Sequence, residues 1–493
     1  MNFKNLFHFH LRFALLVLML SSWSNILSGQ PPDTLWTKFY GDVGWEEGYS
    51  VKETFDGGYI ITGEKYIPTT DGYDLFLLKT DANGDSIWMR TYGGQYCDGG
   101  FCVVQCRDSG YIACGITMLD SINHTEIFLV KVDKNGNLQW SRTYGGTDYD
   151  EGRCVIEITD GYIVAGSTTS YGNSWDAFLM EVDTLGNSVW FKKYDCSGDD
   201  VVFSVKQIND NGFIIAGQTT MNETADILLI KTDPEGDTIW IRNYGRNGFD
   251  SGYSVTVSSN GDYVATGFTD SLGNWDVCLL RVTPDGDLIW FKTYGGENDE
   301  VGSAVMETRN GNIVIAGGTN SYGAGSTDVY LIKVDPNGNL VWQTTYGGGG
   351  DEEAYAIQKT SDNGYVICGY IDTLGTTENR DIYLIKTVQD TLAIEEKDIV
   401  YEGNQRPVLK VIPNPFHDKV AISLFNYNGL ELTEIKAINI YDVAGRLVRV
   451  LPFSKCIEWN GMDQNNEKLN DGVYFCVLHF SDWRLVSKII LVK

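Results

Sequence analysis

The sequence is poor in proline, in histidine and in positive charge. Its 493 residues include 10 Pro and 5 His, and 37 Lys and Arg stand against 66 Asp and Glu, giving a net charge of −29. This acidic balance excludes the basic surface that nucleic-acid binding requires. With 55 Gly but so few Pro, the chain is neither collagen-like nor a low-complexity disordered chain.

Histidine is also too scarce for two common kinds of catalytic or metal site. Only His124, His417 and His479 lie beyond the first 30 residues, and the last two fall in the C-terminal segment. His124 alone in the repeats cannot build a multi-His zinc site or a Ser-His-Asp triad that recurs in each repeat. The sequence lacks a Walker loop, an HExxH motif and an EF-hand loop as well.

The first 30 residues differ from everything after them. Lys4 and Arg12 precede the apolar run Phe13–Leu20, and small and polar residues follow. This order is typical of a secretory signal peptide, and the run is shorter than the roughly 20 residues that span a bilayer. We therefore expect residues 1–30 to be a signal peptide, and the mature chain to be exported without a transmembrane segment.

A tryptophan recurs along the chain with a period near 50 residues, and a tyrosine follows it four positions later. A fixed period of this length is typical of a solenoid, a propeller or an array. Each period contains four short strand-like runs separated by Gly, Asn and Asp, as in Tyr49–Thr54, Tyr59–Gly63, Leu75–Thr80 and Ser86–Tyr92. The repeated residues are Trp36, Trp88, Trp140, Trp190, Trp240, Trp290 and Trp342, with Tyr40, Tyr92, Tyr144, Tyr194, Tyr244, Tyr294 and Tyr346.

The order of these runs predicts an all-β fold, a seven-bladed β-propeller over residues 31–387. The second and third runs are almost wholly apolar and must be covered on both faces, as they are in a blade between two neighbours. The last unit ends at Asp381–Lys386 without a Trp run, whereas the Trp run Asp33–Tyr40 precedes the first complete unit. We predict that the N-terminal run is the fourth strand of the last blade, which closes the ring and removes open sheet edges.

The repeated Trp residues are predicted to pack one blade against the next. Each follows a hairpin with the pattern Asp-x-x-Gly-x-x-x-Trp, as after Asp81 and Asp133. The pattern resembles, one residue shorter, the tryptophan-docking repeats of quinoprotein propellers, in packing alone. Its spacing differs from that of the sialidase Asp box. Over residues 33–387 the units also resemble bacterial surface β-propeller repeats.

The last part of the chain, residues 406–493, follows an acidic segment, residues 388–405, that we interpret as a linker. Its strands and turns suffice for a small Ig-like β-sandwich. Its motifs are Val411–Phe416 with Pro413, Asn414 and Pro415, Ile440–Arg446 with Gly445, Trp459–Gly461, Asp471–Phe475 with Gly472, and Lys488–Lys493. In this order, ending at Lys493, they resemble the C-terminal sorting domains of the type IX (Por) secretion system.

The resemblance implies delivery by the type IX secretion machinery to the exterior or the cell surface of a Gram-negative bacterium, with loss of the sorting domain on delivery. Two other interpretations of this segment stay open. A similar pattern occurs in flagellar hook-cap proteins, and an ordinary ligand-binding Ig module would have comparable strands.

Ten Cys in an exported chain raise the question of disulfides. A Cys456–Cys476 bridge stays open. Four others fall where the remaining repeats have Ser, Thr or Ala, and we expect them to be small buried residues: Cys102, Cys114, Cys154 and Cys368.

Carboxylates recur at two positions of every unit. Because the 4→1 and 2→3 connections of an up-and-down blade emerge on one face, we expect both sets on one face of the ring, with the first set nearer the central channel. The first set, six residues after each repeated Tyr, is Glu46, Asp98, Asp150, Asp200, Asp250, Glu300 and Glu352. The second, at the start of each third run, is Asp74, Glu126, Asp176, Asp226, Asp276, Asp328 and Asp381.

Two roles are open for these acids. They accept backbone N–H groups at turns and brace the neighbouring blade, or the first set forms a ligand or cation site. Neighbouring carboxylates about 8–10 Å apart repel by roughly 0.4–2 kcal/mol, and Ca²⁺, which takes oxygen ligands, would relieve this.

Trp175 and Trp275, in the variable loops of the same face, are candidates for stacking on a sugar ring or for local loop packing.

The sequence therefore predicts a secreted or surface propeller that acts as a binding or adhesion module for a glycan or a surface protein. An enzyme site is expected to break the sevenfold pattern with polar residues unique to a few blades, whereas these acids are nearly uniform. We assign no catalytic residue. A carbohydrate-active enzyme using rim carboxylates and a structural envelope component that self-associates stay open.

Overall fold

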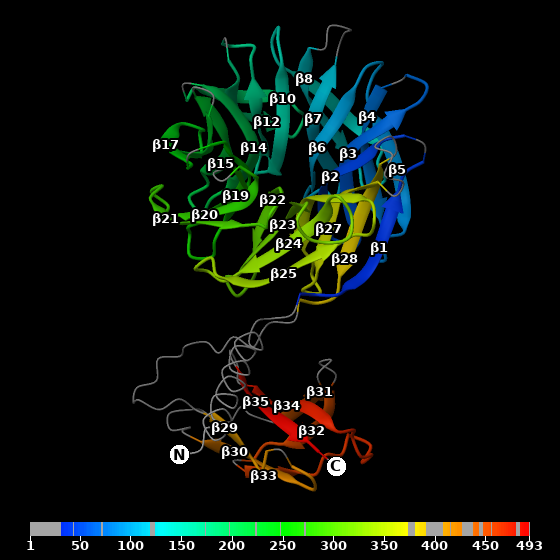
Figure 1. Cartoon of the computed structure of the whole chain (residues 1–493). Helices are drawn as coiled ribbons and strands as arrows, with labels where there is room; N and C mark the ends of the chain where they lie inside the picture. Colours follow the sequence, from blue (N-terminus) through cyan, green and yellow to red (C-terminus); the bar gives the residue numbers. More distant parts are fainter. Residues whose placement is uncertain are drawn as a thin grey trace. The chain divides into compact units, whose positions relative to one another are not determined.

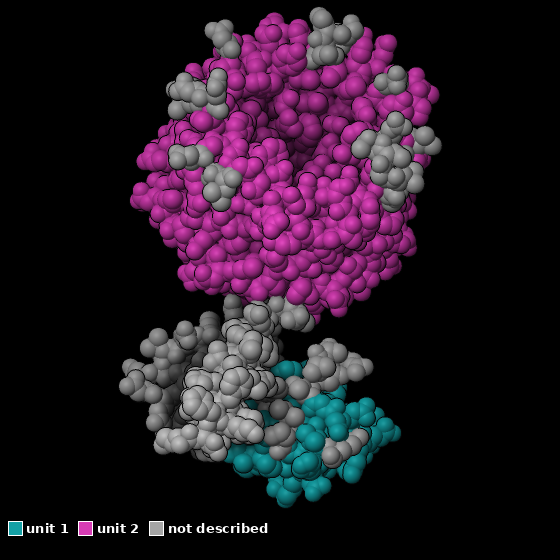
Figure 2. All heavy atoms as spheres, viewed as in Figure 1, with its two compact units in different colours: residues 1–29, 392–493 teal, residues 30–391 magenta. Residues whose placement is uncertain are grey.

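The computed structural model describes residues 31–390 and 408–492, apart from 43, 71, 119–123, 173, 197, 222–223, 247, 271–272, 373–379, 415, 426–436, 443–446, 455 and 480–483. These residues form strands and no helix, so none of them forms a helix that could cross a membrane. They belong to two compact units, one within Gln30–Thr391 and the other within Leu392–Lys493 (Figure 2). The predicted signal peptide and positions 391–405 of the predicted linker lie outside the described residues.

The first unit is the predicted seven-bladed propeller, with four antiparallel strands in each blade. The innermost strands are β2 (Glu46–Glu53), β6 (Asp98–Gln105), β10 (Asp150–Glu157), β14 (Asp199–Gln207), β18 (Asp250–Val257), β22 (Glu300–Glu307) and β26 (Asp351–Lys359). The second strands are β3 (Tyr59–Ile67), β7 (Tyr111–Met118), β11 (Gly161–Thr168), β15 (Phe213–Met221), β19 (Tyr263–Thr269), β23 (Ile313–Thr319) and β27 (Tyr365–Asp372). The third are β4 (Gly72–Thr80), β8 (Thr125–Val132), β12 (Asp176–Asp183), β16 (Thr224–Thr232), β20 (Asp276–Val282), β24 (Asp328–Val334) and β28 (Asp381–Thr387). The outermost are β5 (Ser86–Tyr92), β9 (Leu138–Tyr144), β13 (Ser188–Tyr194), β17 (Thr238–Tyr244), β21 (Leu288–Tyr294), β25 (Leu340–Tyr346) and β1 (Thr34–Tyr40).

The ring closes through the N-terminal strand, as the count of runs predicted. The last blade has the order β1-β28-β27-β26, and β1 pairs with β28 from Thr34↔Thr387 to Tyr40↔Ile382 (Figure 1). On the inside of the ring β2 contacts β26, just as every other innermost strand contacts its neighbour. The blade sheets therefore form a closed ring without a gap between the first and the last blade.

The repeated Trp residues connect each blade to the next one, as predicted, and the repeated Tyr residues, for which no contact was predicted, do so as well. The indole of Trp88 lies against Gly136 in the hairpin of the following blade, where a Cβ atom would come within 3.0 Å of the ring. This hairpin position also has a φ of +77°, so glycine satisfies both the backbone and the close approach. The hydroxyl of Tyr92 donates to the carbonyl of the same Gly136 at 2.7 Å. The last repeat closes the series, because Tyr346 donates to Pro32 O at 2.5 Å.

The second unit is a small sandwich of two antiparallel sheets. One sheet has the order β29 (Val408–Ile412), β30 (Val420–Phe425) and β33 (Cys456–Trp459), and the other has β32 (Leu447–Pro452), β31 (Ala437–Asp442), β34 (Gly472–His479) and β35 (Arg484–Leu491). Trp459, Ile440 and Ile489 are among the buried side chains between the sheets. Gly472 begins β34, and Pro413 and Asn414 follow β29. Three residues of the predicted sorting motif, Pro415, Gly445 and Lys493, lie outside the described residues.

The cysteines behave as the repeat comparison predicted. Cys114 and Cys368 are fully buried, and Cys102 and Cys154 are 8–9% exposed. All ten thiols are free. A Cys456–Cys476 disulfide is therefore not formed, because Cys476 is enclosed in the sandwich core whereas Cys456 is exposed.

Candidate functional site at the channel mouth

The seven acids of the first set are buried rather than open to the channel. Each is at most 1% exposed. The sequence predicted strands that start three residues after the acids, whereas the strands of the structure start at or before the acids and so include them. Six of these carboxylates accept the backbone N–H of the residue four positions earlier, as Asp98 does from Gly94 at 2.7 Å. Glu46 instead pairs with Lys65 Nζ at 2.6 Å. The other five bonds are made by Asp150, Asp200, Asp250, Glu300 and Glu352.

Acids of the two sets meet between neighbouring blades, on one face of the ring as predicted. A Cβ atom at Gly93 would lie 2.4 Å from Asp98 Oδ2 and 2.6 Å from Asp74 Oδ1. Glycine is therefore the residue that lets both carboxylates reach this turn. Burial raises the pKa of Asp98 to about 6, and the charge of Asp74 adds to the shift. This geometry is that of a brace between blades; a direct part of these acids in ligand binding stays a prediction.

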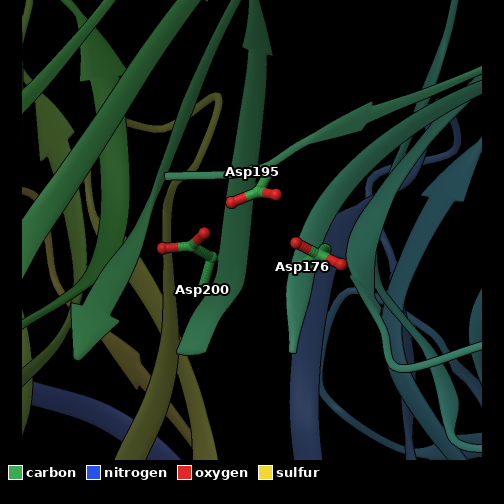
Figure 3. A group of neighbouring side chains, drawn as sticks. All are labelled: Asp176, Asp195 and Asp200. Carbon is green, nitrogen blue, oxygen red and sulfur yellow. The ribbon is translucent and has the colours of Figure 1, made fainter. Parts of the chain in front are cut away.

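One junction departs from this pattern. Asp195 stands between β13 and β14, where the other six junctions have a glycine: Gly41, Gly93, Gly145, Gly245, Gly295 and Gly347. Carboxylate oxygens of Asp176, Asp195 and Asp200 lie within 4.8 Å of one another, and Figure 3 shows the three side chains facing a common space. Lys193 Nζ lies 2.8 Å from Asp176 Oδ2 and offsets part of the charge. The expectation of calcium on this face stays a prediction.

The mouth of the channel is built by a feature that the sequence reasoning missed. Every innermost strand has a β-bulge at the third residue after its ring acid, where the register with the second strand shifts. A bulge re-aims the side chain of the extra residue. All seven bulge residues line one cavity of about 460 Å³: Tyr49, Phe101, Arg153, Phe203, Tyr253, Ser303 and Tyr355. Figure 2 shows a hollow at the centre of the propeller.

Aromatic rings form most of the wall of this cavity. The ring centroids of Tyr355 and Tyr49 are 5.2 Å apart, and those of Tyr49 and Phe101 are 5.6 Å apart. The Arg153 guanidinium lies 4.2 Å from the centroid of Phe101 and 6.0 Å from that of Phe203, and so bridges the two. Small Ser303 leaves a gap in the series.

Trp275 extends the aromatic wall from the loop before β20. It stacks on Phe268 at 4.5 Å, is 44% exposed and lines the cavity, so the structure brings one of the two predicted Trp residues to the site. Trp175 instead packs against Tyr149 at 6.2 Å and is not among the residues that line the cavity.

Carboxylates and arginines stand among these rings. Glu47 accepts hydrogen bonds from Trp45 Nε1 at 2.6 Å and from the Tyr49 hydroxyl at 2.9 Å, and it forms an ion pair with Arg380. Glu151 binds Arg153 through Nε at 2.9 Å and Nη2 at 2.5 Å. These groups occur in only some of the blades, so the channel mouth breaks the sevenfold pattern that the ring acids keep.

Two further carboxyls at the mouth have strongly raised pKa values. Burial raises the pKa of Glu353 to about 7, with a contribution from the charge of Glu47, whereas Arg380 opposes the shift. Burial and Glu47 likewise raise the pKa of Glu64 to about 7, against Arg153. Burial also keeps the phenols of Tyr49 and Tyr355 protonated, by raising their pKa values. The site thus offers hydroxyl donors and carboxyls that change charge near neutral pH.

The bulge positions left a signal in the sequence. Aligning the innermost runs on the ring acid shows Gly two positions after it in five repeats, with Val202 and Ala354 in the other two, followed by a variable and mostly aromatic residue. A glycine within a strand often marks a bulge, and the variable, mostly aromatic residue directly after it indicates a blade-specific side chain at that bulge.

Comparison with family models finds one match within each of the two units. Residues 410–493 match the secretion system C-terminal sorting domain, and residues 308–340 match a β-propeller domain of unknown function. The chain is therefore a seven-bladed β-propeller protein with a type IX sorting domain. The sorting domain marks it for export by the type IX machinery, to the exterior or the cell surface of a Gram-negative bacterium. No protein of curated function matches the sequence.

Several solved structures resemble the chain at low identity. PorZ, a surface component of the type IX secretion system of Porphyromonas gingivalis, is 12% identical with a TM-score of 0.29, over 89% of this chain and 69% of PorZ. Sqt1 of Chaetomium thermophilum is 9% identical with a TM-score of 0.43, over 73% and 98% of the two chains. The polysaccharide lyase Uly1 is 12% identical with a TM-score of 0.46, over 73% and 93%. With TM-scores below 0.5, these likenesses do not bear on ligand or activity.

Proposed function

We propose that this protein is a surface-delivered binding module that recognises a saccharide in the cavity at the channel mouth. One observation carries the proposal: the seven bulges aim their side chains at the channel, and at these positions the repeats differ. Repeats that only have to pack have no reason to differ at one position that faces a cavity, whereas a ligand site needs different groups at different places.

The chemistry of the wall suits a sugar. The C–H faces of a pyranose ring pack on aromatic faces such as those of Tyr355, Tyr49 and Phe101. Its hydroxyls find acceptors and donors in Glu353 and Arg153. The cavity volume of about 460 Å³ falls within the range of roughly 300–1,000 Å³ that is typical of ligand sites.

The domain organisation fits this function. We propose a signal peptide over residues 1–30, the binding propeller over 31–387, a linker over 388–405 and the sorting domain over 406–493. In this arrangement the last part delivers the protein and the propeller binds.

The test is glycan-array binding by the full chain in three forms: wild type, Ser303→Trp and Ser303→Ala. Because Ser303 is the small residue of the ring, an indole there fills the cavity without removing any other group. We expect at least tenfold weaker binding by S303W and unchanged binding by S303A. Equal binding by S303W and wild type, or no glycan bound by the wild type, would contradict the proposal.

A carbohydrate-active enzyme is the second candidate, favoured by one observation. The pKa values of Glu64 and Glu353 are both raised to about 7, which suits a general acid at neutral pH. Release of new reducing ends from any glycan bound on the array, abolished by E64Q or E353Q, would support catalysis over binding alone.

A further inference from the structure

Three carboxylates occupy one position of the innermost strands, one residue after the ring acid. They are Glu47, Glu151 and Glu353, whereas the other four blades have Gly, Val or Ser there. Glu47 is paired with Arg380 and Glu151 with Arg153. The Glu353 carboxylate makes no hydrogen bond or ion pair with a described residue, although the backbone of Glu353 pairs with Tyr370 in the sheet. The three glutamates therefore occupy equivalent positions, but only Glu47 and Glu151 are neutralised by an arginine.

In both pairs, Glu47 with Arg380 and Glu151 with Arg153, the guanidinium also lies on aromatic faces. The Arg380 guanidinium lies 3.9 Å from the centroid of Tyr370 and 4.3 Å from that of Trp45. Arg153 lies 4.2 Å from the centroid of Phe101. A carboxylate beside aromatic faces is the environment that attracts organic cations, and the propeller uses it twice for its own arginines.

Glu353 has the same surroundings without a cation of its own. It lines the cavity together with Tyr355, Tyr253 and Trp275. The charged groups that act on the pKa of Glu353 are Glu47 and Arg380, which are already paired with each other. Glu64 also interacts with Glu47 and Arg153. Together with Glu47, Glu151, Glu353 and the two arginines it forms a group with an excess of two negative charges when all are ionised.

We propose that the saccharide bound at the channel mouth is an amino sugar with a free ammonium group, held by the Glu353 carboxylate and the faces of Tyr355 and Tyr253. This inference rests on the proposed function, because it takes the cavity as the saccharide site. The ammonium replaces the missing third cation, and the sugar ring packs on the aromatic wall.

The test compares two tetrasaccharides that differ in charge: the tetramer of glucosamine and the tetramer of N-acetylglucosamine. Isothermal titration calorimetry with the full chain is expected to give at least tenfold tighter binding of the glucosamine tetramer. E353Q is expected to lose at least tenfold for this ligand and to change little for the acetylated one. E297Q is the matched control, since Glu297 is exposed in the turn between β21 and β22 and its loss changes the charge equally.

The outcomes separate the two proposals. Equal affinity for the two tetramers would overturn the amino-sugar inference and leave a saccharide site standing. An equal loss in E297Q and E353Q would reduce the binding to general attraction of a polycation by an acidic protein, and would also overturn it. Binding of a lysine-rich peptide but of no glycan, dependent on Glu353, would overturn the saccharide function itself. The melting temperature of E353Q, expected to equal or exceed that of the wild type, shows that the variant folds.

Discussion

Removal of strand β1 is the sharpest test of the closed ring. The strand is joined to β28 over six residue pairs, and an antiparallel pair averages about one backbone hydrogen bond for each residue pair. At a net 0.5–1.5 kcal/mol for each bond, the pairing contributes roughly 3–9 kcal/mol. This is comparable with the whole stability of a domain, about 5–15 kcal/mol. We therefore expect a chain without residues 31–40 to lose its cooperative unfolding transition, or to melt about 4–12 °C lower.

The assay is differential scanning calorimetry, repeated with a synthetic peptide of residues 31–42 added in excess. The peptide is expected to restore much of the transition by pairing with the exposed edge of β28. A truncated chain that melts within about 2 °C of the full one would refute the closure.

A matched pair of point variants makes the same test within the full chain. Trp36→Ala and Trp88→Ala remove the same contact, because each indole meets a Tyr edge-on or tilted, at 5.8 Å and 6.0 Å. Each is expected to cost about 2–4 kcal/mol. The cost of W36A should be the larger, since β1 is tied to its blade by pairing alone whereas β5 is also joined to β4 by a hairpin. The reverse order would contradict the closure.

The remaining predictions concern single side chains. Tyr194→Phe removes the buried hydrogen bond to the hairpin of the next blade and is expected to cost about 1 kcal/mol in urea unfolding, whereas Tyr171→Phe, at an exposed position, should cost nothing measurable. The pKa values of Glu64 and Glu353, raised to about 7, lie above the unfolded value of about 4.3. Their contribution to stability is therefore full below pH 4.3 and lost as the pH rises through 7. The E64Q/E353Q double variant should lose less stability than the wild type between pH 4.3 and pH 7. The same pH dependence of stability in the variant and the wild type would contradict the raised pKa values. Asp195→Asn, which removes the third carboxylate at its junction, is expected to raise the melting temperature by about 1–2 °C in EDTA, and a lower value would show that the charge is better balanced than the contacts suggest.

The repeats along the chain were sufficient to predict the ring. The spacing of Trp36 and its repeats, the apolar second and third runs and the surplus N-terminal run led to seven blades and to the closing partner of Asp381–Lys386. These features are local and repeated, so each repeat supports the interpretation of the others. The sorting domain was likewise recognisable, because its motifs stand in order along the chain.

The tertiary structure alone decided the site. Arg380 and Glu47 are 333 positions apart, and only the closed ring makes them partners. Glu353 is a second example. In the repeat pattern it is equivalent to Glu47 and Glu151, and only the structure shows that it has no arginine partner. The bulge that aims Tyr355 at the channel is one extra residue in a strand, which alters no period. Periodicity fixes what the repeats share; which groups meet at the centre depends on contacts between blades, where each repeat has a different neighbour.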